Sequence, residues 1–221
     1  MASEDGRRMR AENLIAVLAA NLEPVDSRRT MRRYALGMTA GALASLILTG
    51  GVLHVNPALP YEVSEPAFWV RELYCASLAV LAVVAVARFA RPGARLGLLP
   101  AGIAAVVLVM WILSATTLLS AASQKRVHLL LGATFVVCPF LIAFLSAPLF
   151  LSFLWILKDL APTRLRWAGA GVGFAAGSIG ALVYTLHCPE LTTPFIGTWY
   201  LLGMLIPTTL GAWLGPPLLR W

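Results

Sequence analysis

Long apolar stretches follow one another along most of this chain, behind a polar and arginine-rich N-terminal segment. Six of them are long enough to cross a bilayer, since a spanning helix needs roughly 20 apolar residues. Their predicted ranges are 34–55, 67–89, 98–119, 136–157, 167–187 and 198–219. Backbone amides inside lipid must bond within their own segment, and these runs are continuously apolar rather than alternating. The sequence therefore predicts an all-α polytopic membrane protein, a bundle of six transmembrane helices.

The N-terminal segment is amphipathic as well as charged. Leu14, Leu18 and Leu22 recur every four residues, with Ile15 beside them, which predicts one apolar stripe on a short helix. A helix of about three turns is marginal by itself in water. The stripe is therefore expected to dock either on the membrane surface or in a groove of a partner protein. It contains no Trp or Phe and its flanks are acidic as well as basic, which favours the protein partner.

Lysine and arginine in the short connections predict the orientation. Most fall on the side of the N-terminal segment: Arg7, Arg8, Arg10, Arg28, Arg29, Arg32, Arg33, Arg88, Arg91, Arg95, Lys158, Arg164, Arg166 and Arg220. The other side has Lys125 and Arg126, with Arg71 a short way into the second span. Both termini are therefore predicted to be cytoplasmic, with residues 1–33 as a cytoplasmic head and residues 34–221 as the transmembrane domain. The net charge of +7 is then mainly a topological signal, and direct nucleic-acid binding is not expected.

Ionisable groups inside the spans are scarce, which limits the chemistry. Apart from Arg88 at the inner end of the second span, Arg71 and Glu72 are the only full charges within an apolar run. They lie near its outer end, where they are expected to snorkel to the interface. As sequence neighbours they are not expected to face each other on a helix. No carboxylate lies at a predicted midplane, which disfavours an ion-coupled transporter. There is no Ser-His-Asp order, phosphate-binding glycine loop or H-E-x-x-H, so neither an enzyme nor a bound cofactor is expected.

A ridge of small residues runs along the fifth predicted span. Gly169, Gly173 and Gly177 are spaced at four, which lets two helices approach closely. The sequence leaves open whether this ridge packs within the monomer or between subunits.

Two cysteines are predicted at matching depth. Cys138 falls just inside the outer end of the fourth span, and Cys188 just beyond the outer end of the fifth. These spans run in opposite directions, so both thiols are expected on the non-cytoplasmic side, which is oxidising in a bacterial periplasm. They are interpreted as unrelated small residues, as a redox-switchable disulfide, or as a soft-metal site together with His187. Cys75, about two turns into the second span, is expected to be buried packing.

Several motifs together resemble the NrsF family of six-span inner-membrane anti-sigma factors. They include Cys138-Pro139, Leu145-Ser146-Ala147-Pro148, Leu160-Ala161-Pro162-Thr163-Arg164, Leu186-His187-Cys188-Pro189-Glu190 and the closing Leu218-Leu219-Arg220-Trp221. Leu-His-Cys-Pro-Glu in a membrane protein that ends Leu-Leu-Arg-Trp is the most specific combination. The resemblance covers essentially the whole chain. It departs at Asn13, where an acidic residue is expected before Leu14.

The resemblance implies a function. The protein would sequester an extracytoplasmic-function sigma factor at the bacterial inner membrane and release it on a metal or oxidative stress signal. Cys138 and Cys188 would receive that signal, repacking the fourth and fifth spans and shifting the loop 158–166 and the head. The implied sigma-factor-binding residues are Asn13, Leu14, Ile15, Leu18 and Leu22. Two alternatives stay open: a small membrane transporter, indifferent to deletion of residues 1–24, and a membrane thiol-redox or cofactor protein, which would need a reactive low-pKa cysteine.

Overall fold

The computed structural model describes residues 27–90, 96–158, 160 and 162–220, apart from the side chains of residues 27–31 and 33. The chain divides into two compact units, residues 1–33 and residues 34–221. In the described part of the chain all regular structure is helical, and six helices are long and apolar enough to cross a membrane. The prediction of an all-α polytopic bundle is confirmed.

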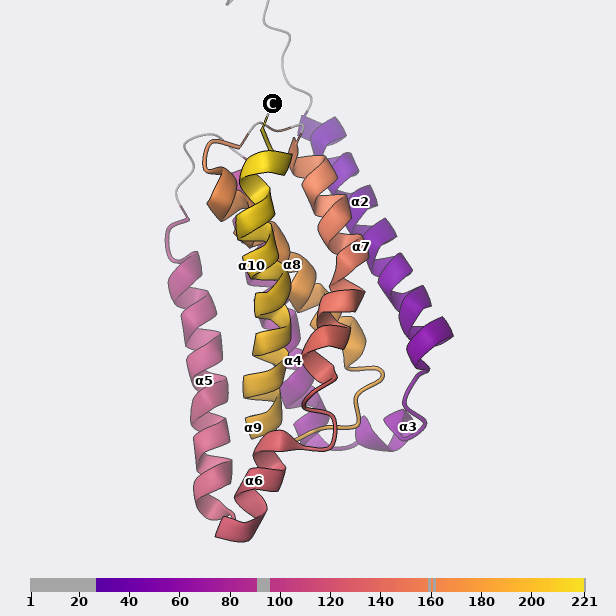
Figure 1. Ribbon diagram of the computed structural model, residues 1–221, viewed down its shortest axis with the longest axis vertical. Helices are drawn as coiled ribbons and strands as arrows, with labels where there is room; N and C mark the ends of the chain where they lie inside the picture. The colour runs from indigo at the N-terminus through magenta and orange to yellow at the C-terminus, as the bar shows by residue number, and fades with distance from the viewer. Residues whose placement is uncertain (1–26, 91–95, 159, 161, 221) are drawn as a thin grey trace, which may run out of the picture. The chain divides into compact units, whose positions relative to one another are not determined.

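The spans follow one another in chain order (Figure 1). They are α2 (Ser27–Leu48) with its π-helical continuation η1 (Thr49–Leu53), α4 (Pro66–Phe89), α5 (Leu99–Ser120), α7 (Cys138–Lys158), α8 (Leu165–Tyr184), and a sixth made of α9 (Thr193–Phe195), η2 (Ile196–Tyr200) and α10 (Leu201–Leu218). Two short helices, α3 (Leu59–Glu62) and α6 (Ser123–Leu131), lie outside the spans and were not predicted, because neither is long enough to show an apolar period.

The sixth span begins at Thr193, five residues before the predicted start at residue 198. Pro194 occupies the first turn of α9, where a proline costs no hydrogen bond and its fixed φ suits a helix. The residues up to Tyr200 then continue as a π-helix. The apolar pattern alone placed the start at about residue 198, because Thr193, Pro194 and Gly197 interrupt the hydrophobic run before it.

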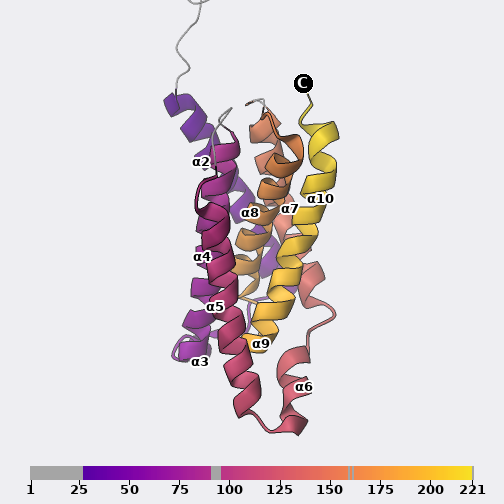
Figure 2. The same ribbon diagram turned by 90° about the vertical axis from the view of Figure 1, so that its left-hand side faces the viewer.

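Helix α8 lies in the middle of the bundle and packs against α4, α7 and α10 (Figures 1 and 2). In the apolar stretch of each span, 67% of α8 is buried, against 11% of α5 and 17% of the span formed by α2 and η1. The interior of the bundle is thus built around α8, while α2 and α5 present most of their surface outward to the surrounding apolar medium.

The glycine ridge of α8 packs within the chain, against α10. A Cβ added at Gly173 would overlap the carbonyl oxygen of Pro207, and one added at Gly169 would overlap that of Gly211. At Gly177 the nearest atom would be the Cα of Met204, at 2.9 Å. The two helices therefore touch backbone to backbone, which only glycine permits.

Helix α2 packs on α7 through a lighter contact. A Cβ added at Gly41 would lie 3.0 Å from the Cα of Leu149. One turn further, the buried Ser45 hydroxyl donates a hydrogen bond of 2.7 Å to the carbonyl oxygen of Leu145. A hydrogen bond and close glycine contacts thus hold α2 against α7.

Helices α3, α6 and α9 lie at one end of the bundle, the lower end in Figure 1. Cys138 begins α7 and Cys188 follows the end of α8 at this same end. We call it the thiol end.

Candidate functional site

The two predicted sensing thiols are brought together at the thiol end. Cys138 and Cys188 are fully buried in one apolar cluster, which also contains Cys75, Tyr184 and Tyr200. Cys138 lies close enough to Cys188 in this cluster to influence the protonation of the Cys188 thiol. All three cysteines are free thiols. Two oppositely running helices thus bring two thiols from distant parts of the chain into one cluster.

Cys188 is the thiol of the pair that the surroundings favour as thiolate. Its pKa is lowered below the ordinary value, chiefly because the Cys138 thiol donates a hydrogen bond to its sulfur. The backbone N–H of Glu190 and the hydroxyls of Tyr200 and Tyr184 lower this pKa further, against the opposing effect of burial. The thiolate is the form that attacks an oxidant or binds a metal ion.

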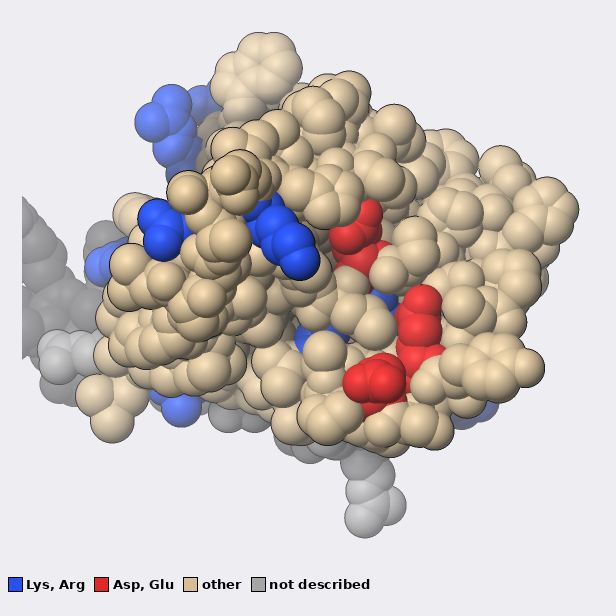
Figure 3. Space-filling view, turned by 90° about the horizontal axis from the view of Figure 1, so that it is seen from below, with Lys and Arg blue, Asp and Glu red and all other residues tan. Residues whose placement is uncertain are grey.

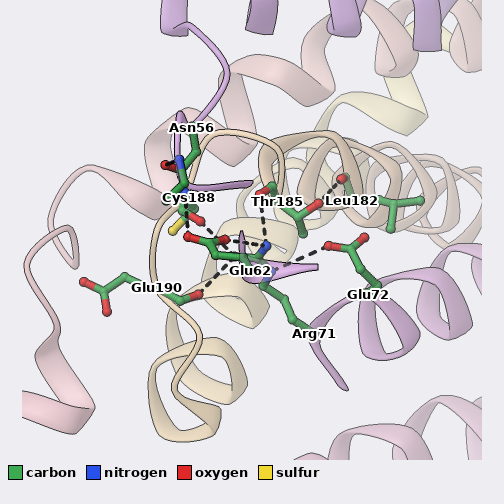
Figure 4. Close-up of polar contacts among 9 residues, drawn as sticks. Asn56, Glu62, Arg71, Glu72, Leu182, Thr185, Cys188 and Glu190 are labelled. Atoms are coloured by element: carbon green, nitrogen blue, oxygen red, sulfur yellow. Dashed lines mark hydrogen bonds and ion pairs between the residues drawn. The ribbon is translucent and has the colours of Figure 1, made fainter. Parts of the chain in front are cut away.

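Arg71 of α4 lies under the turn that carries Cys188 (Figure 4). Its Nη1 donates to the carbonyl oxygens of Cys188 at 2.8 Å and Glu190 at 3.1 Å, and its Nη2 donates to that of Thr185 at 3.1 Å. The side chain is 0% exposed, so the expectation that it snorkels to the interface was wrong. The reason is that α8 ends here and leaves carbonyl groups without a helical partner, and a buried guanidinium can satisfy several of them at once.

Two carboxylates compensate the buried charge of Arg71. Its Nη2 lies 3.7 Å from the Oε2 of Glu62, and its Nε lies 3.6 Å from the Oε1 of Glu72. The Phe68 ring also lies under the guanidinium, with its centroid 5.2 Å from Cζ. The expectation that Arg71 and Glu72 would not meet was therefore also wrong. Both side chains are long enough to reach each other although their Cβ atoms point in different directions.

Glu190 connects the Cys188 turn to the segment that leads into Cys138. Its backbone carbonyl accepts from Arg71, while its carboxylate Oε1 accepts the backbone N–H of Ala133 at 2.7 Å. The preceding Gly132 has a φ of +58°, and a Cβ there would lie 2.7 Å from the same carboxylate oxygen. Only glycine fits this position, because both its conformation and the close carboxylate exclude a side chain.

The turn on the other side of Cys188 is bonded to the end of the first span. The ring Nδ1 of His187 lies 2.8 Å from the carbonyl oxygen of His54, which requires that Nδ1 carry the proton. The backbone N–H of Asn56 donates to the carbonyl of Leu186 at 2.9 Å, and its side-chain amide donates to Glu62 at 2.7 Å. His54 has a φ of +66°, a conformation that non-glycine residues seldom adopt.

The structure does not gather a metal site of the predicted composition. Among the described residues no three His, Cys, Asp or Glu side chains lie close enough to hold an ion. His187 faces the carbonyl of His54 and the Tyr184 ring, whose centroid is 5.8 Å from that of the imidazole. Metal binding by the thiols alone would therefore leave open coordination positions for outside ligands.

The surface of the thiol end differs in charge from the opposite end. Acidic side chains gather on it in Figure 3, and Glu65 and Glu190 are among those that reach the surface, with Lys125 and Arg126 as the exposed basic residues. Arg88, Lys158, Arg164, Arg166 and Arg220 lie at the ends of the spans on the other side.

The two thiols could be predicted from the sequence, but the groups around them could not. Arg71 carried a signal, a full charge in an apolar run, which usually marks function. Glu62, Asn56 and Glu190 lie in connections, where polar residues are ordinary, and nothing in their spacing indicated a common site. The predicted sigma-factor-binding residues Asn13, Leu14, Ile15, Leu18 and Leu22 lie outside the described residues.

These features define a class, a polytopic helical membrane protein with a buried thiol pair at one end of its bundle. The chain belongs to the NrsF family, because the model of that family, described as "Negative regulator of sigma F", matches residues 18–221. It is 45% identical over 213 residues to the probable anti-sigma-F factor NrsF of Azospira oryzae, covering 96% of this chain and 100% of that one. It is 36% identical over 216 residues to the anti-sigma-F factor NrsF of Caulobacter vibrioides, with the same coverage. No solved structure matches. The family resemblance drawn from the motifs is confirmed.

Proposed function

We propose that this protein is an anti-sigma factor of the bacterial inner membrane. It holds an extracytoplasmic-function sigma factor at the membrane and releases it when a soft metal ion or an oxidant reaches Cys138 and Cys188. The observation that carries the proposal is near-complete alignment with two relatives named anti-sigma-F factors. The meeting of the two thiols at one end of the bundle supports the sensing step.

The charge difference between the ends supports the orientation. Lysine and arginine accumulate on cytoplasmic loops, and basic residues predominate at the end opposite the thiols. With that end in the cytoplasm, both termini are cytoplasmic and the thiol end faces the periplasm. Sensor and sigma factor then lie on opposite sides of the membrane, so the bundle must carry the signal across it.

The sensing chemistry follows from the thiol pair. A two-electron oxidant such as a low-molecular-weight disulfide is attacked by the Cys188 thiolate to give a mixed disulfide. Cys138 then displaces the leaving thiol, so the two cysteines lose two protons and two electrons and form one S–S bond. A soft metal ion would instead be bound by the two thiolates with release of two protons. Either event changes the distance and geometry required between the sulfurs.

The contacts of the Cys188 turn favour transmission of the signal from the thiols to the head through α2. A shift of the turn disturbs the bonds of Leu186 and His187 to the end of the first span. Helix α2 continues unbroken to Ser27, and beyond it in the chain lies the proposed docking helix. This route adds to the predicted shift of spans four and five and the loop 158–166, and it needs only one span to move.

The head is the proposed docking surface. The leucine stripe of Asn13 to Leu22 would seat in a groove of the sigma factor, which then cannot engage core polymerase. A tenfold loss of affinity corresponds to about 1.4 kcal/mol. A disulfide typically contributes 2–4 kcal/mol, which is large enough to operate such a switch.

Affinity purification of the tagged protein from solubilised native membranes, with and without residues 1–24, tests this function. We expect a small sigma factor, identified by mass spectrometry, with the full chain and none with the truncated one. A paired variant, Leu14→Glu with Leu18→Glu, should lose the sigma factor too, whereas Ala16→Glu on the opposite side of the predicted helix should retain it. Absence of any sigma factor under both reducing and oxidising conditions would contradict the proposal.

A further inference from the structure

We propose that Arg71 is a positioning residue for the thiol pair: its guanidinium holds the turn 185–190 so that the Cys188 sulfur stays within bonding reach of Cys138. Nothing in the family match assigns a role to this residue. The inference rests on the proposed sensing role of the thiols and deepens it, because it names the group that sets their reactivity toward one another.

The turn that carries Cys188 lies outside the two neighbouring helices. Helix α8 ends at Tyr184 and α9 begins at Thr193. Cys188 lies between them, where its carbonyl is beyond the reach of either helix. Arg71 supplies the missing donors, since two of its nitrogens bond three carbonyls of this short segment, those of Thr185, Cys188 and Glu190. One side chain therefore bonds the backbone on both sides of the Cys188 sulfur.

Arg71 is itself held in place by its surroundings. It is fully buried against Phe68, and carboxylates of α3 and of its own helix flank its nitrogens at 3.6–3.7 Å. The nearby Cys138 is anchored independently, as the first residue of α7. Glu190 closes the arrangement, since its carboxylate binds Ala133 in the segment that leads into Cys138. The two thiols are thus carried by separate elements: Arg71 holds the Cys188 turn to α4, and Glu190 connects that turn to the segment that leads into Cys138.

Holding the turn 185–190 by three of its carbonyls requires an arginine. A planar guanidinium presents several N–H groups in a fixed fork, whereas a lysine ammonium is a compact point charge on a flexible stem. Arg71→Lys keeps the positive charge between Glu62 and Glu72 but cannot bond the three carbonyls in the same geometry. A residue that only neutralised the two carboxylates would tolerate this change, and a positioning residue would not.

The experiment measures disulfide formation in the full-length protein reconstituted in lipid nanodiscs. Diamide is added to the reduced protein. It takes up two electrons and two protons as the Cys138–Cys188 bond forms and is reduced to the hydrazine. Remaining thiols are alkylated at each time point, and the linked peptides are quantified by mass spectrometry, which separates this bond from any bond to Cys75. We expect Arg71→Lys to slow formation about tenfold relative to wild type.

Two controls separate positioning from general destabilisation. Ser45→Ala removes a buried hydrogen bond between α2 and α7 without touching the turn, so it should lower the thermal midpoint while leaving the disulfide rate unchanged. Arg126→Gln removes an exposed guanidinium from the same end of the bundle and should change neither. In SDS, where the turn is no longer held, wild type and Arg71→Lys should form the bond at equal rates.

Equal rates for Arg71→Lys and wild type in nanodiscs would overturn the inference. So would an equal slowing by Ser45→Ala, or a wild-type protein that forms no Cys138–Cys188 bond. The assay contains no sigma factor. A failure of the anti-sigma proposal therefore appears in the purification experiment and leaves these rates untouched.

Discussion

The thiol end and the seam between α8 and α10 are stabilised in opposite ways. Along the seam, glycine ridges let two backbones touch, and no side-chain atoms separate Gly169 and Gly173 from Gly211 and Pro207. At the thiol end the chain leaves its helices, and a few long polar side chains reach across to hold it. Close packing resists any displacement, because every shift creates overlap or a void. Separate hydrogen bonds can break one at a time.

The difference indicates where this molecule can respond to a signal. Local opening is easiest where backbone groups are held by few bonds and hardest in tightly packed cores. We therefore expect a chemical change at Cys138 and Cys188 to move the turn first, with the seam as the fixed support. Substitutions in the seam should therefore have the largest effect, those at the thiol end a smaller one, and those at the contact between α2 and α7 the smallest.

The largest effect is expected from Gly173→Ala. The added methyl group would overlap the carbonyl oxygen of Pro207, so α8 and α10 must separate along their length. We expect most of the protein to be lost as aggregate, measured as the monodisperse fraction after detergent extraction. Gly50→Ala is the matched control, since a Cβ there meets nothing within 4 Å, and it should extract like wild type. A normally folded Gly173→Ala protein would show that the seam is not the rigid region.

Arg71→Gln comes next. It leaves Glu62 and Glu72 partly buried without their cation, and three carbonyls lose a charged donor. Removing one partner of a buried ion pair typically costs about 3–5 kcal/mol. Unfolding in SDS should show a loss of this order. Changing both glutamates to glutamine in the same chain should restore part of it, and a triple variant no more stable than the single one would contradict the charge argument.

Glu190→Ala should have a smaller effect, about 1–2 kcal/mol, because Ala133 is exposed and water can replace the lost carboxylate. The expected change is local. Amide hydrogen exchange of the peptide containing residues 132–137 should accelerate severalfold, while peptides of α8 keep their wild-type protection. Glu65→Ala removes an exposed carboxylate at the same end and should leave exchange in residues 132–137 unaltered.

Ser45→Ala should have the smallest effect, about 0.5–1 kcal/mol, the net value of one buried hydrogen bond between membrane helices. Thr39→Ala is its control, because that hydroxyl bonds only carbonyls of its own helix. A difference between the two variants in SDS unfolding measures how firmly α2 is attached to the bundle. If both variants matched wild type, the α2–α7 contact would contribute nothing measurable.

Much of the bundle could be predicted from sequence because lipid imposes one local rule on every span. A continuous apolar run must be a helix, so six spans could be located to within a few residues. The largest difference is at Thr193, where Pro194 and Gly197 interrupt the run. The matched depth of Cys138 and Cys188 followed from the alternating direction of the spans. The burial of Arg71 could not be predicted in the same way. An arginine in an apolar run has the same sequence context whether it snorkels to the interface or turns inward.

The amino-acid sequence by itself determined the helical class, the number of spans and the membership in the NrsF family, since each depends on composition and order along the chain. The tertiary structure decided that the glycine ridge of α8 closes on α10 of the same chain. It also decided that Arg71 turns inward to the Cys188 turn, and that His54 and His187 join the first span to that turn. These contacts depend on which segments lie side by side at the end of a bundle, and distance in space between residues far apart in the chain leaves no periodic signal in the sequence.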